Sequence, residues 1–453
     1  MRAVVTGGGV AGSASAIALA RIGADVTVYE AYADPAGPVG SYVSLAVNGL
    51  RALDALGCLP AVQAAGFPVA RQRMWSGRGK LLGDVARGRR PEDALHSVTI
   101  MRADLVTALR AAARAAGARI VTGQRLDGPS DRRTADADVI VGADGIWSAT
   151  RRALDPAAPE PAYAGLYSVS GTSDRLAGLP RDGFNWIFAK HGVFIFLPTP
   201  SGAVWWTAQV SAAEPPPDPA AIGVAELTAL FATEAQAAAV LEAATTVRAA
   251  NLGHVLKPVI RRHGDRIVLI GDAAHPVGAG QGASIALEDA VILARHLAAA
   301  GAAAESAESA GTDRSAEAGR SAETGRSAGT GRSAEAGRSP GTGRSAGTGE
   351  TGAISAALAA FDAERQPRAG KLAKMETSNR DAKTAGPIAA RLREVIMPHV
   401  FNRFYENATG WLYDFDPGTV PGSLPGTVSG TVSGSPPVAA PGALPSTLPA
   451  TRD

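Results

Sequence analysis

The sequence is poor in features that would assign the protein to a specialised class. Its 453 residues include a single cysteine, Cys58, so no disulfide can form within the chain, which suits a reducing cytoplasm. We interpret Cys58, next to Gly57 at the end of an apolar segment, as a small core residue rather than a reactive thiol. The formal net charge is only +2, so no global field favours a nucleic acid or a membrane surface as partner. No apolar run approaches about 18 residues, so we expect no segment to cross a bilayer.

The chain is long enough for two domains, or for one large domain with appendages. Its N-terminus predicts a dinucleotide-binding unit: a strand at 2–6, a turn at 7–12 that reads G-G-G-V-A-G, a helix at 14–22 and a strand at 25–29. In this context Gly7 permits the tight turn, Gly9 lets the backbone approach a pyrophosphate, and Gly12 lets the helix pack closely on the strand. The acid that follows would accept the ribose hydroxyls and repel a 2′-phosphate, so FAD or NAD is expected rather than NADP. The residues expected to contact the cofactor here are Gly7, Gly9, Val10, Ala11, Gly12 and Glu30.

A second segment of this type spans 266–297. An apolar strand at 267–270 ends in Gly271 and Asp272, a glycine-rich turn follows, and a helix is expected from Ser284. A carboxylate at the end of a strand before a helix N-terminus is where α/β folds place a cofactor. A third strand, at 138–141, ends in the sequence G-A-D-G at 142–145.

The middle of the chain predicts a different sheet. Strands are expected at 163–169, 186–188, 193–197 and 204–210, with the alternation of an antiparallel sheet packed on one face, and a helix is expected at 225–247. An exposed turn or hairpin is expected at 76–90, and a helix at 105–116 with Asp104 as its N-cap. Three aromatic residues of the sheet either belong to its core or line a substrate cavity: Phe196, Trp205 and Trp206.

Residues 319–349 repeat the pattern G-R-S every six residues, and the compositional bias extends over about 303–352. Lacking aromatic residues and rich in small ones, this insertion should be disordered. Its RS-like arginines raise nucleic-acid binding as an alternative, but interspersed glutamates and the lack of stacking residues argue against it. The tail at 417–453 is rich in Pro, Gly, Ser and Thr and is also expected to be disordered.

Taken together, three motifs resemble the fingerprints of group A FAD-dependent monooxygenases, the para-hydroxybenzoate hydroxylase-like family, and within it the salicylate and urate hydroxylase types. The motifs are 7–12 with Glu30, 138–151 (DVIVGADGIWSATR) and 271–275 (GDAAH). Further matches are 101–105 (MRADL), 357–368 (ALAAFDAERQPR) and 411–417 (WLYDFDP). The resemblance covers most of residues 1–416 outside the repeat.

The resemblance implies an α/β fold: a Rossmann-like FAD-binding domain of the GR2/para-hydroxybenzoate hydroxylase type, a substrate domain with an antiparallel sheet, and C-terminal helices. The expected boundaries are 1–70, 97–160 and 258–300 for the FAD-binding domain, 71–96 and 161–257 for the substrate domain, 301–352 for the disordered repeat insertion, 353–416 for the C-terminal helices and 417–453 for the disordered tail.

The resemblance also implies roles for single residues. Arg102 would reach the FAD phosphates or ribityl chain, or is an ordinary surface arginine; Asp272 would accept hydrogen bonds from the ribityl hydroxyls, or caps a helix. Asp144 and Gly145 would serve both FAD and a transiently docked NAD(P)H. Arg151 would tie that region together, or forms a solvent-facing ion pair.

Near the expected flavin ring, the turn at Gly280, Gln281, Gly282 and Ala283 could aim N–H groups and a helix dipole at the flavin pyrimidine, stabilising its reduced anion. His275 is a weak candidate for catalysis, since the histidine of this motif is usually structural. Asp289, with Glu288 on the following helix, is more readily a structural partner than a catalytic acid.

The implied reaction uses FAD, with NADPH or NADH as transient reductant, and O2 to hydroxylate an aromatic or polycyclic small molecule through a flavin C4a-hydroperoxide. A role in secondary metabolism is one expectation for such an enzyme. We expect a cytoplasmic monomer or homodimer without a metal site. The alternatives are a flavoprotein of the same fold that performs Baeyer–Villiger oxidation, dehydrogenation or halogenation, or a binding protein without turnover. One departure bears on this choice: residues 276–279 form a connection about two residues shorter than the family's, beside the expected flavin face.

Overall fold

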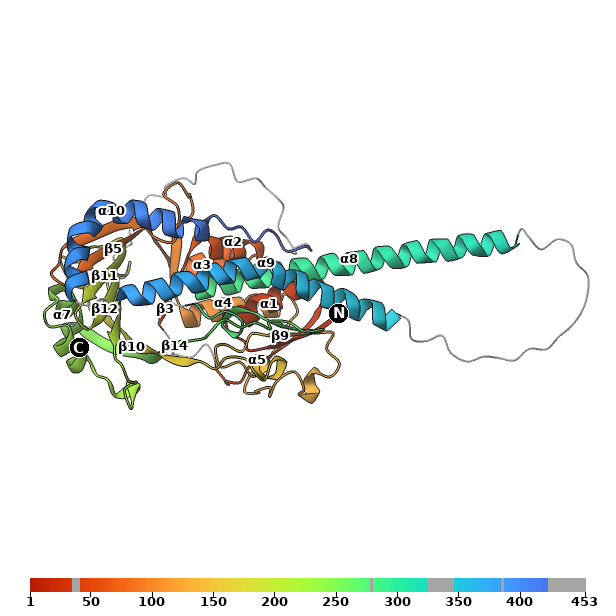
Figure 1. The fold of residues 1–453 in the computed structure, drawn as a ribbon, viewed down its shortest axis with the longest axis horizontal. Coiled ribbons are helices and arrows are strands. Elements are labelled where there is room, and N and C mark those ends of the chain that lie inside the picture. The colour runs from red at the N-terminus through yellow and green to blue at the C-terminus, as the bar shows by residue number, and fades with distance from the viewer. Residues whose placement is uncertain (35–40, 278–279, 324–345, 384–386, 423–453) are drawn as a thin grey trace, which may run out of the picture. The chain divides into compact units, whose positions relative to one another are not determined.

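The computed structural model describes residues 1–34, 41–277, 280–323, 346–383 and 387–422 (Figure 1). Residues 1–422 form one compact unit by their internal contacts. The strands of its two larger sheets fall within the segments assigned above to the FAD-binding and substrate domains. The division into two domains remains a prediction.

The first sheet is parallel throughout, in the order β15-β9-β1-β2-β8. Its strands are the short β-branched runs that the sequence predicts, and residues such as Val5 and Val141 are fully buried. All five strands therefore end at one edge, where the glycine-rich turns meet. The bounds are β1 (Arg2–Thr6), β2 (Asp25–Tyr29), β8 (Arg119–Val121), β9 (Val139–Gly142) and β15 (Ile267–Leu269).

Helices α1 (Val10–Arg21), α4 (Arg102–Ala115) and α8 (Gly282–Glu323) pack around one core with this sheet. The N-cap predicted at Asp104 is wrong. Helix α4 begins at Arg102 with Met101 as N-cap, because Met101 ends the preceding strand in an extended conformation. Asp104 lies in the first turn, where a carboxylate favours the positive end of the helix dipole.

A small antiparallel sheet has the order β3-β7-β4. Its strands lie in the sequence between strands of the two larger sheets. Its strands are β3 (Tyr42–Leu45), β4 (Phe67–Val69) and β7 (Ser97–Met101), with α2 (Val47–Ala55) and α3 (Leu59–Ala65) between them. Cys58 is buried as expected for a core residue, and burial raises the pKa of its thiol to about 11.

The seven-stranded sheet has the order β14-β10-β13-β12-β11-β5-β6. It is antiparallel as predicted except for β5 and β11, which pair in parallel. The hairpin expected near 76–90 is formed by β5 and β6, but the expected exposure holds only for residues 78–81, because the strands on either side of this turn pack into the sheet. The bounds are β5 (Arg71–Ser76), β6 (Leu81–Ala86), β10 (Ala162–Ser173), β11 (Gly183–Ala189), β12 (Gly192–Pro198), β13 (Val204–Ser211) and β14 (Ala244–Val255).

The helix predicted at 225–247 is wrong in part. The structure has α6 (Val224–Leu230) and α7 (Ala235–Glu242), and then the strand β14. The alanine-rich sequence favours a helix, but Thr246 and Val247 are β-branched and pair with Thr172 and Gly171 of β10. The short helix α5 (Ala149–Leu154) follows β9.

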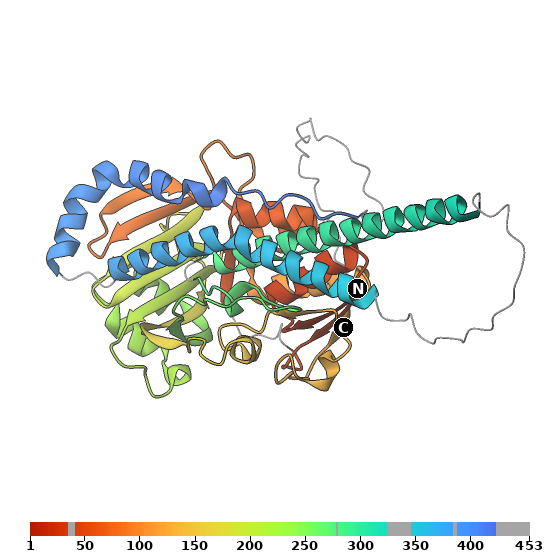
Figure 2. The ribbon, with the colours of Figure 1, turned by 45° about the vertical axis from the view of Figure 1, so that its right-hand side comes forward.

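Helices α8 and α9 (Ala346–Lys383) run side by side in Figures 1 and 2, and α10 (Pro387–Tyr413) contacts β6. The disorder predicted for 301–352 is not what the structure has at 301–323 and 346–352, which continue α8 and begin α9. Residues 302–310 read AAAESAESA, and alanine has the highest helix propensity, so a helix can extend here without a core. The remainder of the insertion, 324–345, and the tail beyond 422 lie outside the described residues.

Candidate cofactor and active site

The three motifs, far apart in the sequence, meet at the carboxyl edge of the parallel sheet. A Cβ added to Gly7 would lie 2.4 Å from the carbonyl oxygen of Ala143, so the first two turns are in contact. A Cβ added to Gly271 would lie 3.0 Å from the Cβ of Ala11, which brings the third turn against the first helix. This edge is where open α/β sheets bind nucleotides.

The first turn has the geometry that its glycines predict. Gly7 has φ +94°, a conformation that favours glycine, and its N–H donates to the Tyr29 carbonyl at 2.8 Å. A Cβ on Gly12 would lie 1.8 Å from the Gly7 carbonyl oxygen, so helix and turn touch backbone to backbone. Above Gly9 the space is open: an added Cβ would meet only Arg102, at 4.0 Å. The N-terminus of α1, beginning at Val10, is thus accessible to a phosphate group.

Glu30 is buried, 6 % exposed, and its oxygens already have backbone partners. Oε2 accepts from the Gly8 N–H at 2.7 Å and Oε1 from the Tyr32 N–H at 3.0 Å. Arg110, from α4, lies 3.9 Å from Glu30 Oε2 and donates through Nε to the Gly8 carbonyl. Glu30 therefore shapes the turn, and its contact with a ribose remains a prediction.

Arg102 and Asp272 face the same open space. Arg102 lies exposed at the start of α4. The surrounding protein raises the pKa of the Asp272 carboxyl by desolvation, against the opposing charges of His275 and Arg102. Asp272 remains exposed, so its carboxylate is accessible, and we call the exposed edge formed by Gly9, Arg102 and Asp272 the cofactor recess. With Gly9 near Arg102, this recess offers a cation for phosphate and a carboxylate for hydroxyl groups.

The second motif is held by its own side chains. Asp144 accepts from the Thr150 N–H at 2.9 Å and from the Ser148 hydroxyl at 2.5 Å, and Gly145 has φ +74°. Arg151 is fully buried and donates to the carbonyls of Ile146 and Ala273 at 2.6 and 3.1 Å. Arg151 thus ties the second motif to the third, and the solvent-facing ion pair is wrong because the guanidinium is enclosed.

The turn before α8 presents an unpaired polar group. Gly280 has φ +95°, and Gln281 is 8 % exposed with no hydrogen-bond partner for its Oε1 among the described residues. Helix α8 begins at Gly282, whose position for an added Cβ lies 3.7 Å from Asp272 Oδ1, and Ala283 follows. A buried amide oxygen normally has a partner, so this one fits a bound ligand. The shortened connection at 276–279 lies partly outside the described residues.

The arrangement fits FAD in its donor and acceptor groups. Gly9, Val10 and Arg102 would hold the pyrophosphate, Asp272 the ribityl hydroxyls, and Gln281 with the N-terminus of α8 the flavin ring. These assignments remain predictions for each residue.

The His275 side chain is held in place by a neighbouring carboxylate. Its Nε2 lies 2.8 Å from Asp289 Oδ2, its backbone N–H donates to the Gly271 carbonyl at 2.9 Å, and it is only 11 % exposed in its side chain. Asp289 also accepts from the Gly271 N–H at 2.8 Å and from Arg365 Nε at 2.7 Å. The contacts support the structural role expected of this histidine; catalysis by His275 stays untested.

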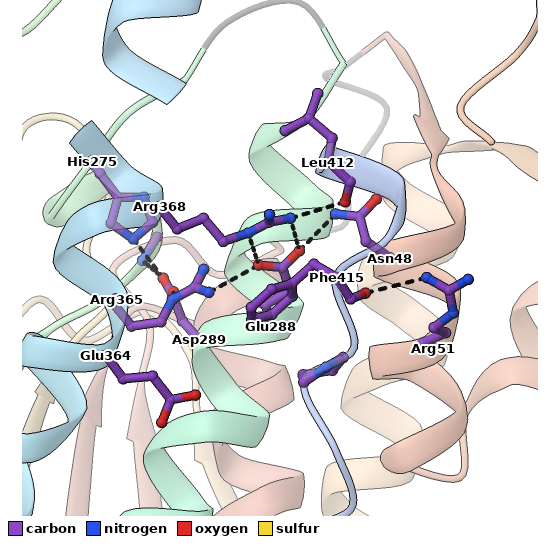
Figure 3. A network of polar contacts seen from close by, with 12 residues as sticks. Asn48, Arg51, His275, Glu288, Asp289, Glu364, Arg365, Arg368, Leu412 and Phe415 are labelled. Atoms are coloured by element: carbon purple, nitrogen blue, oxygen red, sulfur yellow. Dashed lines mark hydrogen bonds and ion pairs between the residues drawn. The ribbon is translucent and has the colours of Figure 1, made fainter. Parts of the chain in front are cut away.

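Asp289 belongs to a buried ion network between α8 and α9 (Figure 3). Arg368 donates to both oxygens of Glu288, at 2.7 and 2.8 Å, and Arg365 Nη1 lies 2.9 Å from Glu288. Asn48, from α2, donates to Glu288 at 2.7 Å. Arg368 also donates to the Leu412 carbonyl, so the segments 357–368 and 411–417 contact each other as well as α8. These C-terminal segments thus help to hold α8, the helix that follows the turn at Gly280.

One face of the seven-stranded sheet carries aromatic residues toward β3. Trp205 stacks on Tyr42 at 5.7 Å between ring centroids, Phe67 lies edge-on to Trp205 at 5.3 Å, and Phe184 lies 5.8 Å from Tyr42. The Tyr42 hydroxyl accepts from Thr207 at 3.3 Å, and burial raises its pKa to about 12. We call Tyr42, Phe67, Phe184 and Trp205 the aromatic face.

The substrate-lining role predicted for Phe196 and Trp206 is wrong. They are paired across β12 and β13, fully buried, and packed on the other side of the sheet among residues of α6 and α7 such as Leu227 and Val240. Because side chains alternate along a strand, Trp205 and Trp206 necessarily point to opposite faces. Only Trp205 remains a candidate to line the substrate site.

A cavity of about 210 Å³ adjoins the aromatic face, lined by Phe67, Val69, Gly183, Leu197 and Val204 among others. None of the three motifs lines this cavity, so it is separate from the cofactor recess.

Two arginines beside the site were missed from the sequence. Arg110 follows Arg102 by eight residues, on the same face of α4, and this helical spacing could have indicated it. Arg87 contacts Phe184 and approaches Gly280, but it lies in an arginine-rich, polar stretch whose pattern indicates only exposure.

No helix among the described residues is long and apolar enough to span a bilayer.

Comparison with known proteins identifies the family of the chain. A family model described as an FAD binding domain matches residues 1–323. Kynurenine 3-monooxygenase of Salinispora arenicola is 30% identical over 353 residues, 69% of this chain and 77% of the relative. Aurachin C monooxygenase/isomerase of Stigmatella aurantiaca is 29% identical, over 65% of this chain and 80% of the relative. FAD-dependent urate hydroxylase of Klebsiella pneumoniae is 28% identical with the same coverage.

Solved structures share the fold. Klebsiella pneumoniae HpxO complexed with FAD and uric acid has a TM-score of 0.64 at 20% identity, covering 90% of this chain and 96% of HpxO. The tetrameric form of 2-methyl-3-hydroxypyridine-5-carboxylic acid oxygenase has a TM-score of 0.62 at 20% identity, covering 88% and 96%. With the matching family model and three converging motifs, the chain belongs to the FAD-binding group A flavin monooxygenases, and FAD is its cofactor.

Proposed function

We propose that this monooxygenase hydroxylates an aromatic or polycyclic small molecule, with NADPH or NADH as reductant and O2 as the oxygen source. The observation that carries the proposal is the position of the aromatic face. Arg87 lies over the Phe184 ring at 4.7 Å and also 3.2 Å from where a Cβ on Gly280 would be. Arg87 therefore links the aromatic face to the turn that precedes α8.

The chain's own groups would orient the substrate and exclude water. Tyr42 and Trp205 offer stacked rings against which a planar substrate would pack. The Tyr42 hydroxyl, protonated at neutral pH because its pKa is about 12, is able to donate a hydrogen bond to an oxygen of the substrate. Bound FAD, once reduced, supplies the activation of O2. The N–H groups at the start of α8 and their helix dipole would stabilise negative charge on the reduced ring.

The remaining details are also proposals. The names of relatives that act on quinolones and aurachin support a role in secondary metabolism. We infer a cytoplasmic enzyme from the single buried cysteine. We assign His275 a structural role, since its Nε2 contacts Asp289 and its backbone N–H contacts Gly271.

The test is a screen of aromatic compounds with the purified, FAD-loaded protein. We expect at least one compound to increase the rate of NADPH or NADH oxidation and to yield a product carrying one oxygen atom from isotopically labelled O2. Heat-inactivated protein with free FAD is the control. Stimulated oxidation with a product that lacks the label would indicate dehydrogenation instead, and the absence of stimulation by every compound would reject the proposal.

A further inference from the structure

The arginines around β5 and β6 differ in what they contact. Arg71 and Arg73 both pair with Asp84, at 2.8 and 3.3 Å, and Arg90 pairs with Asp414. Arg87, which directly follows β6, has no carboxylate within 4.0 Å among the described residues. Its contacts are with neutral groups.

Those contacts place Arg87 between the two parts of the active site. Its guanidinium donates to Gln72 Oε1 on β5 and to Ser44 Oγ on β3, the latter at 3.4 Å. It lies over the Phe184 ring and close to Gly280. Gln72 is 3 % exposed and Ser44 is 8 % exposed, so the guanidinium is held by a buried polar frame.

A half-buried cation without a counter-charge is unfavourable, because desolvation is not offset by an ion pair. A guanidinium in such a position is suited to an anionic group that arrives with a ligand, which it binds through two parallel N–H donors. The cofactor phosphates are expected at another place, over Gly9 beside Arg102. The group that reaches Arg87 from the aromatic face is then part of the substrate.

We propose that Arg87 binds an anionic group of the substrate, a carboxylate or an equivalent oxyanion, and so makes the enzyme selective for aromatic acids. This inference rests on the proposed function, since it assigns a substrate class to the same site. Phe184, Tyr42 and Trp205 would hold the ring, and Arg87 would hold the acid beside the Gly280 turn.

The experiment compares aromatic acids with their neutral amides. Salicylate, anthranilate and kynurenate, each paired with its primary amide, are titrated into the FAD-loaded protein, and binding is followed by the perturbation of the flavin absorbance spectrum. We expect the dissociation constant of at least one acid to be lower than that of its amide by about ten-fold or more, as a charge-assisted bidentate contact requires. In Arg87→Gln that preference should disappear, with the amide affinity unchanged. Arg87→Lys should retain part of it.

Arg71→Gln is the matched control. It removes the same charge from the same sheet, but its guanidinium is bound to Asp84, so the preference for the acid should persist. Flavin content and thermal unfolding of each variant establish that the fold is kept. If every amide binds as tightly as its acid, or if Arg87→Gln changes FAD affinity while the preference for the acid survives, the inference is wrong.

The two proposals fail separately. Labelled product from neutral aromatics, together with no preference for acids, would leave the proposed function standing and remove the role of Arg87. A preference for acids that depends on Arg87, without stimulated oxidation by any compound, would support the binding site and reject hydroxylation.

Discussion

At the scale of single residues, the shape of the cofactor recess depends on two positions that only glycine can occupy. Gly7 and Gly12 are required for different reasons: Gly7 by its positive φ, and Gly12 by the 1.8 Å between an added Cβ and the Gly7 carbonyl oxygen. Both reasons follow from the strand–turn–helix pattern, so both were predictable from the sequence.

Gly12→Ala should therefore lose bound FAD and lower the free energy of unfolding by about 1–3 kcal/mol, since the backbone atoms it would overlap cannot move aside easily. FAD absorbance after gel filtration and thermal unfolding measure the two effects. Gly301→Ala is the control: Gly301 also lies within a helix, nothing lies within 4 Å of its added Cβ, and the variant should be slightly more stable. Full FAD content in Gly12→Ala would contradict the assignment of this turn.

The partners of Asp289 could not be predicted from a local sequence pattern. The sequence indicated Asp289 only as a structural partner, while the structure shows that its carboxylate accepts from Gly271, His275 and Arg365. Those partners come from three segments, and no local spacing reveals that they converge on one carboxylate.

At the scale of elements, Asp289 joins β15, α8 and α9. The charges of His275 and Arg365 and the hydrogen bonds to Asp289 keep the pKa of its carboxyl below the ordinary value, although burial opposes them. A carboxyl whose pKa is depressed in the folded state contributes stability above its unfolded pKa, about 3.9, and loses that contribution as the pH falls through the folded pKa.

Asp289→Asn should therefore be less stable than the parent protein by about 3–5 kcal/mol at neutral pH, because Arg365 loses a buried counter-charge. The difference should shrink as the pH is lowered below about 4, where the unfolded parent chain becomes protonated. Urea unfolding across this pH range measures it. Asp54→Asn, at an exposed position of α2, should show little difference at any pH, and a gap for Asp289→Asn that is independent of pH would disprove the linkage.

The elements themselves were predicted best where local pattern and tertiary environment agree. The parallel strands and the helices α1 and α4 match their buried periodic runs, although both helices begin earlier than expected, at Val10 and Arg102. The expected helix at 225–247 failed because β14 depends on its pairing with β10, a partner distant in the chain. The substrate role expected for Phe196 and Trp206 failed because a pattern of alternation does not say which face of a sheet meets the cofactor.

At the scale of the whole molecule, the repeat insertion lies between two helices that contribute residues to one core on either side of it. Leu297 on α8 and Ile354 on α9 belong to the same buried core, whereas the described side chains of 301–306 are exposed or partly exposed. The core contacts between the helices therefore lie outside the insertion.

Replacing residues 303–352 with a short Gly/Ser linker should leave the FAD content and stimulated turnover within about two-fold, with the unfolding free energy changed by about 1–2 kcal/mol through loop closure. Turnover and urea unfolding of the shortened protein are the measurements. A variant with the order of residues 303–352 scrambled controls for length and composition. Loss of FAD on deletion, with retention in the scrambled variant, would show that the insertion is needed as a spacer.

A dinucleotide cofactor was predictable from the sequence alone, because the turn that binds it works through glycines and a helix N-terminus that are local in the chain, and the three motifs together indicated FAD. The sequence also determined the α/β class, since buried parallel strands leave apolar runs bounded by glycine. Only the tertiary structure decided which side chains face the flavin turn. Trp205 rather than Trp206 faces β3, and Arg87 lies beside Gly280 with no carboxylate partner among the described residues. Both facts depend on how two sheets are placed against one turn.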